Sequence, residues 1–85
     1  MQFNRIGGLV EDLHIWSATS NGFSFVISFE TRGGPGLRGR LGYLASWRPI
    51  YQSRSAIKVG GSPFETLAEA ETACATMLAH LIRPV

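Results

Sequence analysis

The segment from residue 14 to residue 30 reads HIWSATSNGFSFVISFE, and it decides the fold. Asn21 and Gly22 at its centre form the two-residue turn that most strongly favours a β-hairpin, because both residue types tolerate positive φ. After this turn, large apolar residues alternate with smaller or polar ones, at Phe23, Phe25, Ile27 and Phe29. A period of two is typical of an antiparallel strand buried on one face. The segment therefore predicts two paired strands, 14–20 and 23–30.

Further strands are predicted on both sides of this hairpin. Residues 31–40 contain four glycines and a proline, which predicts a loop. Residues 41–47 alternate again and predict a third strand, which ends before Pro49. Residues 50–55 predict a loop in which Tyr51 is partly exposed, and residues 56–59 predict a short fourth strand. Residues 2–6 are either a short strand or an arm.

A helix is predicted over about residues 66–82. Thr66 can cap it, and Glu69 three residues later completes a capping box; Ser62 followed by Pro63 could start the helix one turn earlier. Pro84 ends it. Apolar residues recur at helical spacing on one side, at Leu67, Ala70, Cys74, Met77, Leu78 and Leu81. A helix of this length is marginal in isolation, so this stripe must pack on a sheet.

The predicted fold is therefore α+β, with an antiparallel sheet of three to four strands packed on one C-terminal helix. The sheet face that meets the helix should carry Trp16, Phe23, Phe25, Ile27, Phe29, Tyr43, Trp47, Ile57 and Val59. The other face, called the open face below, should carry Ile15, Ser17, Thr19, Ser24, Val26, Ser28, Arg40, Leu44, Ser46, Arg48 and Lys58.

The bulk composition predicts one globular domain, residues 1–85. Hydrophobic residues make up 45% of the chain and charged residues 16%, the opposite of a disordered composition. One cysteine, Cys74, allows no intrachain disulfide, which fits a reducing compartment. No stretch approaches the ~18 apolar residues of a membrane helix, and no signal peptide is apparent. We expect a cytoplasmic protein that does not bind a membrane.

Patterns that would indicate catalysis, a cofactor or a metal are missing from the sequence. Cys74 and His80 are six residues apart, which places them on roughly opposite sides of the predicted helix. Gly34, Gly36 and Gly39 match G-x-G-x-x-G, but the residues that follow are β-periodic, whereas a dinucleotide site needs a helix there. We therefore predict no catalytic residue, no cofactor and no metal ligand, and interpret the chain as a binding protein and not an enzyme.

Charge is distributed unevenly along the chain. Residues 31–64 hold five arginines, one lysine and no acid, whereas the two flanking segments are each net negative by two charges. Such asymmetry can indicate an anionic partner. The candidate partner-binding residues are Arg32, Arg38, Arg40, Arg48, Arg54 and Lys58. Because the aromatic residues of the strands share the face that the helix needs, duplex contact is expected over single-strand stacking.

Two resemblances bear on function. The segment Phe64-Glu65-Thr66-Leu67-Ala68-Glu69-Ala70, with Ala73 beyond it, resembles the sheet-to-helix junction of small three-stranded DNA-binding domains, such as the plant ethylene-response type and the arm-binding domain of phage integrases. That resemblance implies a sheet that enters the major groove. In size and style the chain is also similar to short phage and prophage accessory proteins, including anti-CRISPR proteins, which inhibit a host complex by binding to it.

Two hypotheses follow from these observations. The first is a phage-type inhibitor or adaptor that acts on a host protein or nucleoprotein complex. The alternative is a small duplex-DNA-binding module that uses the basic segment 32–58. A contiguous arginine patch would favour nucleic acid, and scattered arginines beside an apolar patch would favour protein. Exposed strand edges also leave a homodimer open.

Overall fold

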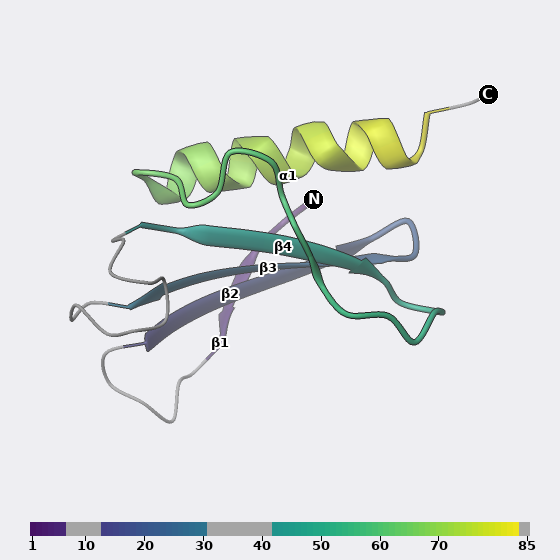
Figure 1. The fold of residues 1–85 in the computed structure, drawn as a ribbon, viewed down its shortest axis with the longest axis horizontal. Helices are drawn as coiled ribbons and strands as arrows, with labels where there is room; N and C mark the ends of the chain where they lie inside the picture. Colours follow the sequence, from purple (N-terminus) through teal and green to yellow (C-terminus); the bar gives the residue numbers. More distant parts are fainter. Residues whose placement is uncertain (7–12, 31–41, 84–85) are drawn as a thin grey trace.

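The computed structural model describes residues 1–6, 13–30 and 42–83 of the chain. Its elements are β1 (Asn4–Ile6), β2 (Leu13–Ser20), β3 (Phe23–Glu30), β4 (Leu44–Pro49), β5 (Ile57–Lys58) and α1 (Leu67–Leu81). The five strands form one sheet in the order β1-β2-β3-β4-β5, and every neighbouring pair is antiparallel. Helix α1 lies across one face of this sheet (Figure 1). The predicted α+β fold is confirmed, with one strand more than expected.

The predicted hairpin is present in β2 and β3. Asn21 and Gly22 both have positive φ, at 53° and 83°, as a tight two-residue turn requires. Ser20 then pairs with Phe23, and the pairing continues without interruption to Leu13 and Glu30. The local turn chemistry therefore sets the register of the whole pair.

The N-terminal segment is a strand and not an arm. Asn4 pairs with Ser17, Arg5 with Trp16 and Ile6 with Ile15. The Arg5 guanidinium also hydrogen-bonds Nδ1 of His14 on the neighbouring strand.

The third and fourth predicted strands differ from their expected limits. Strand β4 begins at Leu44, because Tyr43 forms an isolated bridge with Phe64, and it extends to Pro49, which pairs with Phe23. Leu41 lies outside the described residues. Strand β5 is shorter than residues 56–59, although the Val59 amide still donates to the carbonyl of Ala45 at 2.9 Å.

From Tyr43 to Trp47, the edge of the chain that faces away from β3 is covered by the segment that leads to the helix. Tyr43 and Phe64 exchange two backbone hydrogen bonds of 2.8 Å. Between that bridge and β5, the buried Ser62 hydroxyl accepts from the Ala45 amide at 3.0 Å and donates to the Ala45 carbonyl at 3.1 Å. Ser62 thus replaces a strand residue at this point, so the earlier helix start at Ser62 is wrong. The close packing needs Gly42, where a Cβ would lie 2.8 Å from Cβ of Pro63.

Helix α1 starts and ends close to the predicted limits. The Thr66 hydroxyl accepts from the Glu69 amide at 3.1 Å, which confirms the predicted cap. At the other end, the Ile82 amide donates to the Leu78 carbonyl at 3.0 Å. Within the described residues, no helix combines the length and the apolar character needed to cross a membrane.

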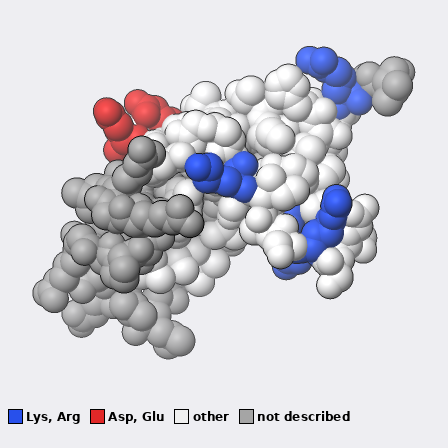
Figure 2. All heavy atoms as spheres, viewed as in Figure 1, with Lys and Arg blue, Asp and Glu red and all other residues white. Residues whose placement is uncertain are grey.

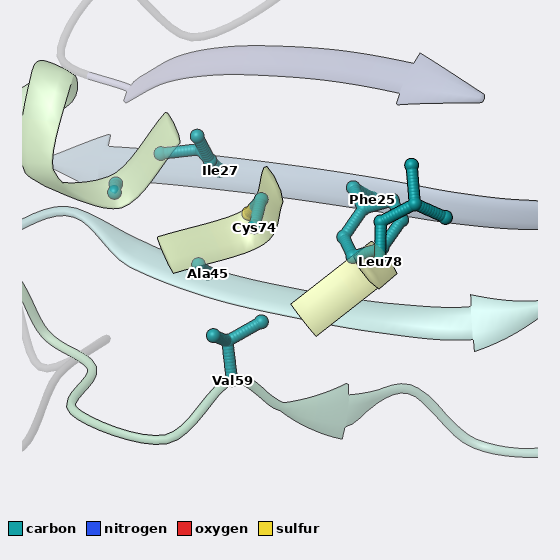
Figure 3. Packing of buried hydrophobic residues seen from close by; sticks show 7 residues of the cluster. Phe25, Ile27, Ala45, Val59, Cys74 and Leu78 are labelled. Carbon is teal, nitrogen blue, oxygen red and sulfur yellow. The ribbon is translucent and has the colours of Figure 1, made fainter. Parts of the chain in front are cut away.

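The core lies between α1 and the central strands. Figure 3 shows Phe25 and Ile27 of β3 pointing into the same space as Cys74 and Leu78 of α1. Ala45, Val59 and Ala70 complete the buried cluster, and Ala45 and Ala70 have no exposed surface, so helix and sheet approach closely. The predicted helix-facing set is confirmed by the register. One member, Ile57, shares the face but is 41% exposed, because β5 lies at the sheet edge beyond the helix.

Candidate binding surface on the open sheet face

The open face is built from rows of side chains that the register places side by side. Directly paired residues of antiparallel strands point to the same face of a sheet. The first row is Ile6, Ile15, Ser28 and Leu44; the second is Asn4, Ser17, Val26, Ser46 and Lys58; the third is Thr19, Ser24 and Arg48. Every described residue that the sequence assigned to the open face is on it. Arg40 lies outside the described residues.

Aliphatic side chains gather at one end of this face. Ile6 and Ile15 are direct neighbours, and Val26 lies diagonal to both Ile15 and Leu44, which is within reach for side-chain contact. Ile6 is 46% exposed, and the other three aliphatic residues are half-buried. We call Ile6, Ile15, Val26 and Leu44 the apolar patch. No described helix packs on it, since α1 contacts the opposite face (Figure 1).

Two of the predicted partner-binding residues meet at the other end of the face. Lys58 pairs with Ser46, and Arg48 lies two residues further along β4, so the two cations are diagonal neighbours. Both side chains are exposed. Arg54 is exposed on the link between β4 and β5, where its amide donates to the carbonyl of Gln52 at 2.9 Å. The other three candidates, Arg32, Arg38 and Arg40, lie outside the described residues.

The charges of the described residues are separated in space. Figure 2 shows lysine and arginine side chains as separate groups with uncharged surface between them. The acidic side chains gather at the end of the molecule where α1 begins, which matches the exposed Glu65 and Glu69. The molecule therefore carries an acidic helix start and a basic region on the β4–β5 side.

Sequence reasoning underestimated one residue of this surface, Tyr51. The sequence places it in a loop as a partly exposed residue, but its side chain is 89% exposed. Its ring lies against the β2–β3 turn, where a Cβ added to Gly22 would be 3.5 Å from a carbon of the ring. Pro49 signals that the strand ends nearby, but only the folded hairpin brings the turn next to Tyr51.

The groups that could carry out chemistry are dispersed or protected. Cys74 is fully buried, and its desolvation, with a smaller contribution from the nearby Glu71 carboxylate, raises the pKa of the thiol from 9.0 to about 11. The thiol is therefore protonated at neutral pH and is a poor nucleophile. His80 is exposed on α1. In the described part of the chain, histidine, cysteine and carboxylate side chains form no group of three that could hold a metal ion.

Comparison of the chain with protein-family models, curated proteins and solved structures finds no match to any of them.

Proposed function

We propose that this protein is a non-catalytic binding protein that docks its open sheet face on a partner protein, as an inhibitor or adaptor of a host protein or nucleoprotein complex. The observation that carries this proposal is the apolar patch beside the exposed cations Arg48 and Lys58 on one face of the sheet.

The composition of the open face supports a binding role. Serine contributes little to strand stability in comparison with β-branched and aromatic residues, yet Ser17, Ser24, Ser28 and Ser46 all lie on this face. Their short side chains leave the neighbouring aliphatic groups accessible. Burial of an aliphatic side chain stabilises a protein or a complex by roughly 1.5–3 kcal/mol. The four residues of the apolar patch are only partly buried in this protein, so a partner that covers them would gain part of this free energy.

The size of the face sets how far the interface must extend. The five strands contain 3, 8, 8, 6 and 2 residues, and about 4.8 Å between strands with about 3.4 Å per residue gives an area of roughly 440 Å². A stable protein interface buries about 800 Å² on each partner. The partner must therefore also contact the rim of the sheet, where Arg48 and Lys58 lie. We expect it to present an apolar surface bordered by carboxylates.

The same features favour a protein over a DNA duplex. Duplex binding requires several cations on one continuous surface. Arg48 and Lys58 are diagonal neighbours, but Figure 2 shows the described cations as more than one group with uncharged surface between them, and the aliphatic side chains occupy the other end of the sheet face. Duplex DNA remains the alternative that the experiment must exclude.

The test is affinity capture with matched variants. Leu44→Glu places a carboxylate in the apolar patch, and Thr76→Glu places the same charge on the exposed side of α1. A bacterial lysate treated with nuclease is passed over the wild-type protein and both variants, after circular dichroism has shown that all three are folded. We expect a protein that is retained by the wild type and by Thr76→Glu but is lost with Leu44→Glu.

A photo-crosslinking residue then identifies the contact surface. It is placed at Ser46 on the open face in one protein and at Thr76 in a control. Crosslinks to the captured protein should form from position 46 alone. Equal retention by all three proteins, or crosslinking from position 76 and not from 46, would contradict the proposal. Capture from an untreated lysate, but not from the nuclease-treated one, would favour the nucleic-acid alternative.

A further inference from the structure

The end of the sheet opposite the apolar patch carries a different kind of surface. Tyr51 is 89% exposed, more than any other large apolar residue described. Its position is fixed by the neighbouring backbone, because the Ile50 amide donates to the Gly22 carbonyl at 2.9 Å and the Tyr51 ring lies against Gly22. An aromatic ring is thus presented to solvent on a supported turn.

Three cations lie near Tyr51 in the sequence or in the register of the sheet. Arg48 precedes Tyr51 by three residues, Arg54 follows it by three, and Lys58 lies on the adjacent strand, diagonal to Arg48. All three side chains are exposed, and the segment 31–64 contains no acidic residue. We call Tyr51, Arg48, Arg54 and Lys58 the basic corner.

Hydrogen-bonding side chains border the basic corner on the sheet. Ser24 pairs directly with Arg48, and Thr19 pairs with Ser24 on the next strand. Hydroxyl groups, guanidinium groups and ammonium groups are the side chains that most often contact phosphate oxygens. The corner therefore combines phosphate-binding groups with an accessible aromatic face.

We infer that the basic corner binds single-stranded nucleic acid, with Tyr51 stacking on a base and the three cations contacting the flanking phosphates. Proteins that bind single strands combine these two elements, because an unpaired base exposes a face on which a ring can stack. In a duplex the base faces are already stacked on each other, so an exposed tyrosine would gain little there. This inference differs from the sequence-based expectation of duplex contact, which considered only the aromatic residues of the strands.

The inference goes beyond the proposed function: it shares Arg48 and Lys58 with the proposed docking face, but it depends on Tyr51 and Arg54 and does not require the partner protein. It also suits a partner that is a nucleoprotein complex, since the apolar patch and the basic corner could then be occupied together.

The test is fluorescence anisotropy with a labelled oligothymidine of about 16 nucleotides and a duplex of matched length, at about 50 and 200 mM salt. Three phosphate contacts on a single strand predict a slope of about −2 in log K against log salt, or about a 20-fold loss of affinity over this range. Tyr51→Leu should weaken binding by about 5- to 150-fold, since stacking contributes about 1–3 kcal/mol per base. Tyr51→Phe keeps the ring and should bind nearly as the wild type does.

Two further variants separate the corner from general charge attraction. Arg54→Ala should reduce the salt slope by about 0.7. Arg83→Ala removes an exposed cation after α1 and should leave the slope unchanged. Because Tyr51 and Arg54 are exposed, both variants should fold as the wild type does.

Three results would overturn the inference. They are no binding of oligothymidine at the lower salt, equal binding of the duplex, and unchanged affinity of Tyr51→Leu. Binding of polyglutamate with the same affinity as oligothymidine would likewise show a general polyanion surface. None of these results bears on the Leu44→Glu capture experiment, so the two proposals fail separately.

Discussion

The two faces of the sheet use the same strands for different purposes, and β3 shows this most clearly. Phe25 and Ile27 point toward α1 and have no exposed surface, whereas Ser24, Val26 and Ser28 point to the open face and are half-buried. The backbone pairing is common to both sets. The difference in burial therefore comes from the layer that covers each face and not from the strand itself.

The helix face therefore serves mainly the stability of the fold, and the open face is available for binding. The helix face carries the buried cluster, where each large side chain contributes roughly 1.5–3 kcal/mol by leaving water. Side chains on the open face contribute less to folding, so their identity is free to serve recognition. If the two faces differ in this way, substitutions on the helix face should lower stability more than matched substitutions on the open face.

The largest effect should come from truncating the helix face. We expect Phe25→Ala to lower the free energy of unfolding by about 3–5 kcal/mol, because it leaves a cavity under α1. Urea denaturation followed by circular dichroism measures this change. If Phe25→Ala does not fold, Ile27→Val at the next buried position should cost about 0.5–1.5 kcal/mol.

The neighbouring Val26→Ala is the matched control on the open face. It should cost well under about 1.5 kcal/mol, since Val26 is only half-buried. A loss as large as that of Phe25→Ala would show that the open face is a second core, and the comparison between the faces would not hold.

The next effect concerns the edge of β4 that pairs with Ser62. Ser62→Ala removes the hydroxyl that pairs with both backbone groups of Ala45, and the buried amide loses its partner. We expect a loss of up to about 3 kcal/mol, measured by urea denaturation. Ser46→Ala removes a hydroxyl from the open face of the same strand and should change stability by less than about 0.5 kcal/mol. Similar values for the two variants would mean that Ser62 has no structural role.

The pH dependence of the free energy of unfolding should show whether water reaches the side chains between α1 and the sheet. Burial raises the pKa of the Cys74 thiol to about 11, so the unfolded chain loses this proton at lower pH than the folded protein does. The contribution to stability is constant below about pH 9 and decreases as the pH rises toward 11, where the loss reaches about 2 kcal/mol.

Cys74→Ala isolates this contribution, because tyrosine and lysine residues titrate alike in both proteins. The difference in unfolding free energy between wild type and Cys74→Ala, measured at several pH values from 8 to about 11, should change by about 2 kcal/mol. A constant difference would show that water reaches the thiol in the folded protein.

The smallest effect should come from the start of the helix. Thr66→Ala removes the cap that the Glu69 amide requires and should cost about 1 kcal/mol. Thr76→Ala lies on the exposed side of α1 and should be neutral or slightly stabilising, because alanine has the higher helix propensity. Thermal unfolding of the pair measures the difference, and equal melting temperatures would argue against the cap.

The surface was predictable from the sequence only in part. The alternation in residues 23–30 and 43–48 assigned Val26, Leu44 and Arg48 to the open face, because side-chain direction follows directly from strand periodicity. The diagonal placement of Arg48 relative to Lys58 depends on the register of β4 with β5, which two exposed residues in β5 do not encode locally. Arg32, Arg38 and Arg40 remain predictions that lie outside the described residues.

The sequence by itself determined the β2–β3 hairpin, the helix with its Thr66 cap and the division of the strands into two faces. Each of these depends on interactions between residues close in the chain, which turn chemistry, capping and periodicity express directly. Only the tertiary structure decided that β1 joins the sheet, that Ser62 completes the edge of β4 and that Tyr51 lies on the β2–β3 turn. Those contacts join residues distant in sequence, and they form only when burial of the helix face brings the segments together.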